Sequence, residues 1–294
     1  MLKRELIVVF IYTIFADREI LWFDNSVMNN DKSIKIQCPA KVNLNLKVLN
    51  KREDGFHNIE SVMQTISLYD YLTVSAEDAN ELEINLSGNN SEIPYNEKNL
   101  VWKAIKLFFD ETKLLPQKIS VYIDKNIPVA AGLAGGSTDA AGMLFGLNEM
   151  FDRPLDRENL HKLCSKLGSD LNVCLQGGRI MSRGRGEIIE PLEFKEFNLS
   201  LIKPKNLGIS AKEAYTKFSK KTKTPERENF QNDLEWALIE DYEELQEIKR
   251  IYPKSVMTGS GSTYFMIDGE FENQNGYQVF NNLKAVKDGV CIIE

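Results

Sequence analysis

A glycine-rich stretch from Pro128 to Thr138 combines residue types that suit a phosphate-binding loop. Glycine and other small residues let the backbone approach a phosphate closely, and consecutive amide groups can surround an anion. A helix that begins near Ser137 would add unpaired N–H groups and the positive end of its dipole. No lysine follows the glycines, so the Walker pattern GxxxxGK[ST] is absent and a different phosphate loop is predicted. Its expected lining residues are Pro128, Ala130, Ala131, Gly132, Leu133, Ala134, Gly135, Gly136, Ser137 and Thr138.

The structural alternative for this stretch is a flexible turn or a tight helix contact. The stretch lies between a predicted strand over residues 119–123 and an apolar helical pattern that ends near Met150. A small-residue loop between a strand and a helix N-terminus is a typical setting for phosphate binding. The setting therefore favours phosphate binding over the alternative.

Two charged residues are candidates for the transfer chemistry. Asp170 follows a helix stop at Gly168, and phosphoryl transfer needs a carboxylate that orients and deprotonates the attacking hydroxyl. Spacing alone favours a helix cap for Asp170, since aspartates beside glycine and serine usually form caps or turns. Lys41 lies on the polar face of a predicted strand, together with Asn43, and such lysines are usually solvated. If Lys41 faces Asp170, it would stabilise the carboxylate and the developing charge.

Phe56 and His57 follow an Asp54-Gly55 turn and could stack on and hydrogen-bond a flat ring. They could equally be a loop aromatic that covers the core and a surface histidine, and the residues alone leave both interpretations open. Two further stretches, residues 183–187 and 259–261, are rich in glycine and suit an anion, but are also typical of hairpin turns.

The elements that must position these residues follow from hydrophobic periodicity. The expected strands cover residues 34–48, 62–68, 82–86, 119–123, 188–189, 199–202 and 290–293, with shorter ones around 173 and 180; residues 256–267 carry the glycine-containing segment 258–263. The expected helices cover residues 99–113, 137–150, 157–167 and 230–251, with a short helix after a capping box at Ser210 and Glu213. The pattern restarts near residue 195, which predicts a boundary between an N-terminal domain over 33–195 and a C-terminal domain over 196–294.

Residues 1–32 are expected to be an extension outside the core. The apolar run over residues 6–15 is shorter than the ~20 residues that span a bilayer and lacks a clear cleavage site. We interpret Met28 as the true start of the protein.

The composition narrows the classes of partner. There are 36 Lys and Arg against 43 Asp and Glu, a net charge of −7, and the pI is about 5.2. This balance disfavours nucleic acids and anionic membranes, which need positive surface. The 4 cysteines and 2 histidines complete no zinc pattern. Free thiols indicate a reducing, cytoplasmic setting, and nothing in the sequence indicates the oligomeric state.

Several of these segments together resemble the GHMP kinases, the family of galactokinase, homoserine kinase and mevalonate kinase. The glycine-rich stretch resembles their central motif. The resemblance covers the chain from about residue 34 to the end, and is carried also by residues 39–46, 54–57, 167–170, 232–235 and 258–263. The segments at 39–46, 54–57 and 167–170 are similar to one branch of the family. That branch phosphorylates the 2-hydroxyl of a CDP-linked methylerythritol in the non-mevalonate isoprenoid pathway.

The resemblance implies an α+β fold of two domains, the first like ribosomal protein S5 and the second ferredoxin-like. It implies ATP as the phosphoryl donor, CDP-methylerythritol as the small-molecule acceptor, and Mg²⁺ with the ATP. It also implies Asp170 as catalytic base with Lys41 as its partner, Asn43 in the acceptor site, and Phe56 and His57 around the cytosine. The metal ligand is unknown, with Ser137 as a candidate.

Three departures from the family pattern stand out. Phe56 occupies a position where tyrosine is usual and keeps the stacking face without the hydroxyl. Asn172 replaces a common proline, and Ala134 and Thr138 are small variations in the glycine stretch. The rival interpretations are a GHMP kinase for homoserine, mevalonate or a sugar, and a non-catalytic RNA-binding module on the same scaffold. The Asp54-to-His57 segment argues against the first, and the acidic composition argues against the second.

Overall fold

A computed structural model describes residues 32–222 and 231–293. These residues belong to one compact unit. The interpretation of Met28 as the start, and of nearly all of the 1–32 extension, falls outside the described residues. No helix in the described part of the chain is long and apolar enough to cross a membrane.

The first sheet has eight strands and is built around the long strand β3. On one half of β3 the order is β12-β1-β3-β5-β4, with only β4 and β5 parallel; on the other half β3 pairs with β2 and β6, and β6 with β7. The strands are β1 (Lys32–Asn43), β2 (Lys47–Lys51), β3 (His57–Asp78), β4 (Glu83–Gly88), β5 (Gln117–Asp124), β6 (Arg179–Arg183), β7 (Ile188–Pro191) and β12 (Cys291–Ile292). The β1–β3 register shifts between Pro39 and Ala40, a bulge of the kind that bends a strand pair.

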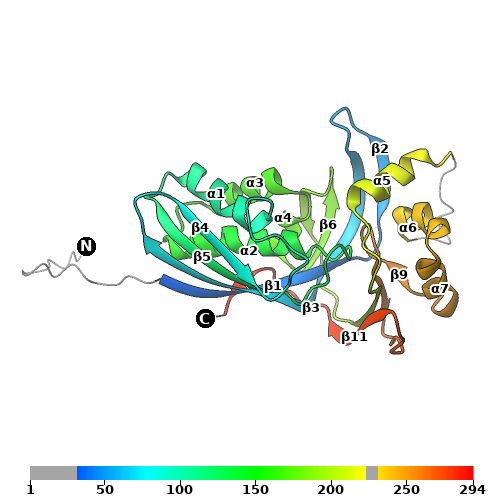
Figure 1. Cartoon of the computed structure of the whole chain (residues 1–294). Helices are drawn as coiled ribbons and strands as arrows, with labels where there is room; N and C mark the ends of the chain where they lie inside the picture. Colours follow the sequence, from blue (N-terminus) through cyan, green and yellow to red (C-terminus); the bar gives the residue numbers. More distant parts are fainter. Residues whose placement is uncertain (1–31, 223–230, 294) are drawn as a thin grey trace, which may run out of the picture. The chain divides into compact units, whose positions relative to one another are not determined.

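Four helices cover one face of this sheet (Figure 1). They are α1 (Leu100–Thr112), α2 (Gly135–Met150), α3 (Arg157–Leu167) and α4 (Leu171–Gln176). Asn99 caps α1 by accepting a hydrogen bond from Val101 N, as the sequence predicted. Apolar residues of the helices and of alternate strand positions form one core, in which Leu72, Phe108 and Leu144 are fully buried.

The second sheet has four antiparallel strands in the order β11-β8-β10-β9. Its strands are β8 (Asn198–Pro204), β9 (Val256–Met257), β10 (Tyr264–Ile267) and β11 (Tyr277–Lys284), accompanied by α5 (Ala211–Lys220), α6 (Asp233–Leu238), the 3-10 helix Ile239–Asp241 and α7 (Glu243–Ile251). A further core combines Val42 and Leu133 from the first part of the chain with Leu201 and Phe265 from the second. The two sheets therefore share buried side chains, and the final strand β12 returns to pair with β1.

Three predicted elements differ from the structure. The strand expected over residues 34–48 breaks after Asn43, because the side chain of Asn45 accepts the Val62 N–H that a continuous ladder would use. Val173 lies in the short helix α4 rather than in a strand; a short apolar run cannot be told from a buried helix by periodicity.

The helix expected over 230–251 is interrupted. It divides into α6, a 3-10 turn and α7, with an extended Tyr242 between the last two. The break is held against α5, where the Tyr242 hydroxyl bonds to Glu213 and Lys217 forms an ion pair with Asp241. These tertiary contacts override a continuous amphipathic pattern.

Candidate active site

Lys41 is a buried lysine near the end of β1, with 2% of its surface exposed. Its Nζ donates to Asn43 Oδ1 at 2.7 Å and to the backbone oxygen of Gly132 at 3.0 Å. The same Nζ lies 3.3 Å from Asp170 Oδ2. The prediction that Lys41 and Asn43 point the same way is confirmed, and Lys41 contacts both the glycine stretch and the candidate carboxylate.

Asp170 occupies the N-cap position of α4, but its side chain makes no capping hydrogen bond. Its carboxylate is paired with Lys41 instead, and its side chain remains 29% exposed. The cap interpretation favoured by spacing therefore does not describe the side chain. A partly exposed carboxylate beside a buried cation is available to accept a proton from a bound hydroxyl.

Asn172, the departure two residues after Asp170, fixes this turn by hydrogen bonds. Its amide nitrogen donates to Ser165 Oγ at 2.9 Å and to Glu187 O at 2.8 Å. Its Oδ1 lies 3.1 Å from His161 Nδ1. The turn is thus tied to α3 and to the β6–β7 hairpin without the rigidity of a proline.

The glycine stretch forms a loop that leads into α2. Ala130, Gly132 and Ala134 all have positive φ angles of 50°, 75° and 60°. The helix begins at Gly135, and no side chain caps it. The N–H groups at the start of α2 are therefore not occupied by a capping side chain, which is the arrangement that binds phosphate.

The loop after β9 packs backbone to backbone against the glycine loop. A Cβ on Gly132 would lie 2.2 Å from Thr258 O, and one on Gly259 would lie 2.9 Å from Gly132 O and 3.3 Å from Lys41 Nζ. Thr258 Oγ1 also accepts a hydrogen bond from Asn43 N at 2.9 Å. Only glycine allows this approach. The segment 259–261, for which an anion site and a hairpin turn were both open, therefore packs against the glycine loop and Lys41.

Asn232, from the segment 232–235 that carried part of the resemblance, is fully buried behind this loop. Its side chain donates to Met257 O at 2.7 Å and to Gly259 O at 2.8 Å, while its Oδ1 accepts from Leu234 N. Asn232 therefore caps α6 and holds the Gly259 loop at the same time.

His57 and Phe56 lie in different environments although they are neighbours. The His57 ring is buried and stacks on Tyr215 of α5, with centroids 5.5 Å apart and an interplanar angle of 16°. Burial, with a smaller effect of Lys51, lowers the pKa of His57, so its ring is neutral near pH 7. Phe56 is 49% exposed and therefore does not cover the core.

Tyr215 is a residue that sequence analysis missed. Burial raises the pKa of its hydroxyl, and the charge of Asp170 raises it further, which places Tyr215 within electrostatic range of that carboxylate. The capping box at Ser210 predicted the helix that carries Tyr215. No local pattern indicated that this helix would pack against His57, which is distant in the chain.

Sequence analysis also missed a buried charge cluster behind the glycine loop. Lys125 Nζ bonds to Asp70 Oδ2 and, at 3.0 Å, to Asp139 Oδ2. Asp70 Oδ1 accepts the N–H groups of Asn126 at 2.6 Å and Ile127 at 2.8 Å, the residues that lead into the loop. Burial and Asp70 raise the pKa of Asp139 to about 7 against the opposing effect of Lys125. The cluster connects β3, the entry to the loop and the second turn of α2.

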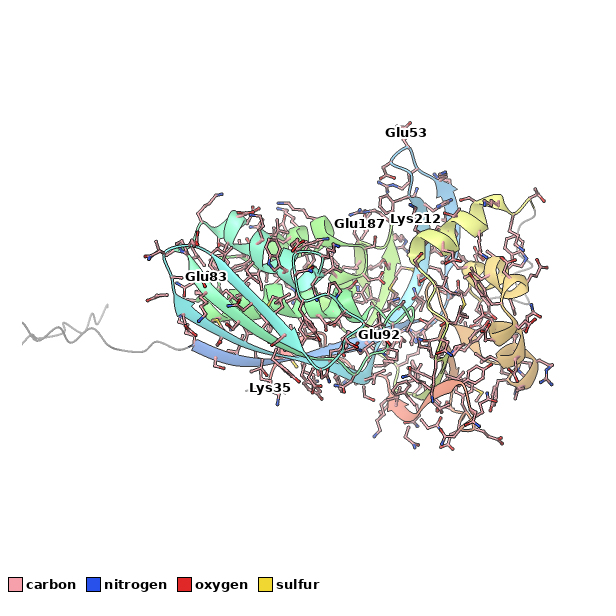
Figure 2. The ribbon with its side chains drawn as sticks, viewed as in Figure 1. Lys35, Glu53, Glu83, Glu92, Glu187 and Lys212 are labelled. Atoms are coloured by element: carbon pink, nitrogen blue, oxygen red, sulfur yellow. The ribbon has the colours of Figure 1, made fainter. Side chains whose placement is uncertain are left out.

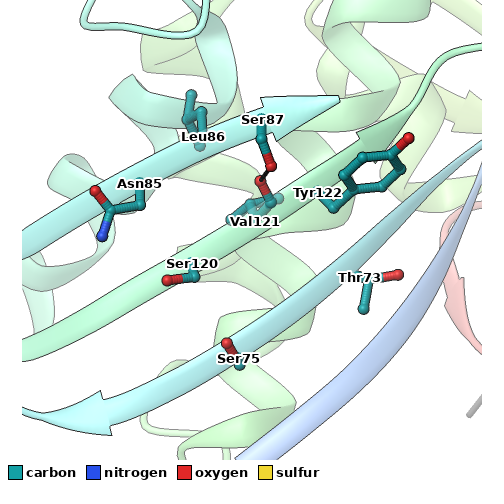
Figure 3. Close-up of a pocket in the computed structure, with 8 residues that line it drawn as sticks. All are labelled: Thr73, Ser75, Asn85, Leu86, Ser87, Ser120, Val121 and Tyr122. Carbon is teal, nitrogen blue, oxygen red and sulfur yellow. Dashed lines mark hydrogen bonds between the residues drawn. The ribbon is translucent and has the colours of Figure 1, made fainter. Parts of the chain in front are cut away.

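An open pocket lies on the β3–β5–β4 face (Figure 3), and none of its lining residues belongs to the candidate site. Its lining contains no carboxylate, lysine, arginine or histidine; it comprises Thr73, Ser75, Asn85, Leu86, Ser87, Ser120, Val121 and Tyr122. Within residues 32–222 and 231–293, no group of three or more His, Cys, Asp or Glu side chains could hold a metal ion.

Comparisons with known proteins agree with the resemblance. A profile of the GHMP kinases N-terminal domain matches residues 99–178. The 4-diphosphocytidyl-2-C-methyl-D-erythritol kinase of Clostridium tetani is 40% identical over 256 residues, which cover 79% of this chain and 90% of the relative.

Solved structures give the same result for the fold. A crystal structure of 4-(cytidine 5'-diphospho)-2C-methyl-D-erythritol kinase has a TM-score of 0.68 and 26% identity, and covers 86% of this chain and 100% of its own. The homoserine kinase of Cytophaga hutchinsonii has a TM-score of 0.67 with 15% identity over 89% of this chain and 97% of its own, and shows the fold alone.

The strand–loop–helix arrangement within this α+β fold is that of a kinase of the GHMP class, and the expected fold class is confirmed. Sequence identity then separates the members of that class. The chain belongs to the 4-diphosphocytidyl-2-C-methyl-D-erythritol kinases.

Proposed function

We propose that this enzyme transfers the γ-phosphate of ATP to the 2-hydroxyl of 4-diphosphocytidyl-2-C-methyl-D-erythritol, with Asp170 as the catalytic base. The observation that carries the proposal is the position of Lys41, whose ammonium joins Asp170 to the glycine loop through Gly132 O. A base and a phosphate site fixed by one side chain can present a hydroxyl to the γ-phosphate in line.

In this mechanism Asp170 orients the acceptor hydroxyl and takes its proton as the oxygen attacks phosphorus. Lys41 keeps the carboxylate oriented and offsets negative charge as the phosphoryl group moves. Because Lys41 is buried, its interaction with charge is screened less than that of a surface lysine. Asn43 fixes Lys41 from the opposite side through its Oδ1.

The loop residues 128–138 hold the ATP phosphates in this proposal. The unpaired N–H groups at the start of α2 and its dipole favour the negative charge of the phosphates. Gly136 is exposed at this point, so its backbone is accessible to a ligand. The start of α2 thus supplies a local positive potential for the phosphates, although the net charge of the chain is −7.

Magnesium supplies positive charge to the phosphate oxygens when it accompanies ATP. Mg²⁺ prefers oxygen donors and is usually held by one or two protein groups together with the phosphates. Ser137, in the first turn of α2, presents a hydroxyl oxygen of this kind and is half-buried. We propose Ser137 as a protein ligand of that ion.

The acceptor base is assigned to the region of Phe56, His57 and Tyr215. A half-exposed aromatic ring beside a neutral, buried imidazole suits a flat heteroaromatic ring with polar edges. Homoserine and mevalonate carry no such ring, which favours the cytidine-linked acceptor. Tyr215 supports the imidazole from its other face.

We also propose a cytoplasmic location. All four cysteines are free, and three of them are buried. Free thiols are typical of proteins in a reducing compartment.

An ATP-consumption assay with CDP-methylerythritol, mevalonate and homoserine as separate acceptors tests the proposal. We expect turnover with the first acceptor alone. Turnover of mevalonate or homoserine at comparable kcat/KM, with none for CDP-methylerythritol, would refute the acceptor assignment.

A further inference from the structure

The turn of the β6–β7 hairpin, residues 183–187, has no part in the mechanism above although it lies next to Asp170, the proposed catalytic base. A Cβ on Gly186 would lie 3.1 Å from Ser169 Cβ and 3.7 Å from Asp170 Oδ1. The Gly186 carbonyl accepts from Ser182 Oγ at 2.6 Å, which fixes the turn. The residue before Gly186 is therefore held close to the reacting end of the acceptor.

That residue, Arg185, is positioned by several contacts. Its Nη2 donates to Ser165 O at 2.7 Å, and its backbone N–H donates to Glu187 Oε2 at 2.7 Å. Its guanidinium carbon lies 5.2 Å from the centroid of the Phe56 ring, within the range of a cation–π contact. Glu187, labelled in Figure 2, also lies 3.8 Å from Nε through its Oε1.

The guanidinium keeps binding capacity after these contacts. Its only hydrogen bond among the described residues uses Nη2, and an arginine has several further N–H donors in one plane. Glu187 balances part of the charge but lies beyond hydrogen-bond distance of Nε. A planar fork of donors matches phosphate oxygens better than any other side chain.

Arg185 also lies between the residues assigned to the two ends of the acceptor, where its diphosphate would be bound. Phe56, in the turn between β2 and β3, is assigned to the cytosine end. Glu53, labelled in Figure 2, lies in the same turn. Asp170, against Gly186, is assigned to the hydroxyl end. The diphosphate joins these two ends, so it must pass the segment that carries Arg185.

We propose that Arg185 is a specificity-determining residue that binds the diphosphate of the nucleotide-linked acceptor while its guanidinium contacts the Phe56 ring. The inference rests on the proposed function, because it assumes a cytidine diphosphate group between Phe56 and Asp170. It adds a reason for preferring a nucleoside diphosphate over a nucleoside or an uncharged polyol.

The test compares CDP and cytidine as competitive inhibitors of the wild-type enzyme and of Arg185→Gln. We expect the inhibition constant of CDP to rise roughly 10- to 100-fold in the variant, as for loss of charge-assisted hydrogen bonds. The inhibition constant of cytidine should change by no more than about threefold, since only support of the Phe56 ring is lost. Higher salt should weaken CDP binding to the wild type more than to the variant.

Arg183→Gln is the matched control, because Arg183 lies in the same hairpin and pairs with exposed Glu190 on the surface. It should leave both inhibition constants unchanged. Arg185→Lys should recover part of the CDP affinity, since it keeps the charge without the planar fork. Equal weakening of CDP and cytidine in Arg185→Gln would overturn the inference, because Arg185 would then act only through Phe56.

The wild-type measurements separate this inference from the proposed function. If neither CDP nor cytidine competes with the acceptor in the wild type, the nucleotide site itself is wrong and both proposals fall. If both compete but the preference for CDP survives Arg185→Gln, only the inference about Arg185 falls. A melting temperature within about 2 °C of the wild type shows that the variant is folded.

Discussion

Lys41 Nζ lies 3.3 Å from Asp170 Oδ2, although Lys41 comes from the first strand and Asp170 from the turn before α4. The pair is asymmetric, since Lys41 is almost fully buried while the Asp170 side chain keeps 29% of its exposure. The cation is therefore enclosed by protein, and the carboxylate stays partly accessible to solvent.

Asp170→Asn should remove most turnover and leave ATP binding nearly intact. General-base catalysis typically contributes about 10²–10⁴-fold, so we expect kcat to fall within that range. Steady-state kinetics with CDP-methylerythritol, together with calorimetry for ATP, measures both effects. Asp110→Asn, which changes an exposed carboxylate on α1, is the control and should keep wild-type kcat. Wild-type kcat in Asp170→Asn would refute the assignment of the base.

Phe56→Ala should weaken acceptor binding by about 1–3 kcal/mol, the range for base–aromatic stacking. The loss should appear in the KM of the acceptor, since the base is held equally in the ground and transition states. Because Phe56 is half exposed, the melting temperature and the KM of ATP should stay unchanged. Phe56→Tyr should leave the KM of the acceptor nearly unchanged, because tyrosine keeps the stacking face. A rise in both KM values with a lower melting temperature would show that Phe56 has a structural role instead.

Gly132→Ala should destabilise the enzyme and raise the KM of ATP. Its Cβ would lie 2.2 Å from Thr258 O, and its φ of +75° disfavours any L side chain. Gly276→Ala is the matched control, since Gly276 has a φ of +87° but no atom within 4 Å of the added carbon. The control should cost about 1 kcal/mol of backbone strain, without any kinetic effect. Equal melting temperatures for the two variants would show that the loops can separate at little cost.

The stability difference between Asp139→Asn and the wild type should depend on pH. The pKa of Asp139 is raised to about 7 in the folded protein, against an ordinary value of 3.8. The folded state then binds the proton more tightly than the unfolded state, so this group stabilises the fold at low pH and the contribution is lost between about pH 4 and 7. Asp139→Asn has no carboxylate at this position, so its stability does not fall for this reason as the pH rises.

Asp139→Asn should therefore gain stability relative to the wild type as the pH rises from about 4 to about 7. Urea unfolding of both proteins at several pH values measures the difference. The charges that face Asp139 are Lys125 and Asp70, and they are unchanged in the variant. A difference that is constant over this pH range would contradict the raised pKa.

Much of the fold was predictable because its signals are local. The cap at Asn99, the helix over 157–167 and the cap at Ser210 were predicted from a few neighbouring residues. The broken helix after Asn232 was not, because its interruption depends on contacts with α5.

The residues of the candidate site also fall into those with local sequence signals and those without. Residues 128–138 could be identified from composition and setting. The interpretation of Asp170 as a base needed the family resemblance, because its sequence surroundings describe a cap. Tyr215 and the cluster around Lys125 could not be found at all, since their partners are distant in the chain and the pairing exists only after folding.

The pairing of β12 with β1 has a consequence for the synthesis of the protein. Ile292 lies opposite Ile36, so one edge of the first sheet is completed only by a strand that is synthesised much later than β1. At about 5–20 residues per second, the outer edge of β1 stays unpaired for on the order of tens of seconds after it emerges. During that interval β1 presents free backbone groups of the kind that template aggregation. The nascent chain is thus open to chaperones at β1 until the strand β12 has been made.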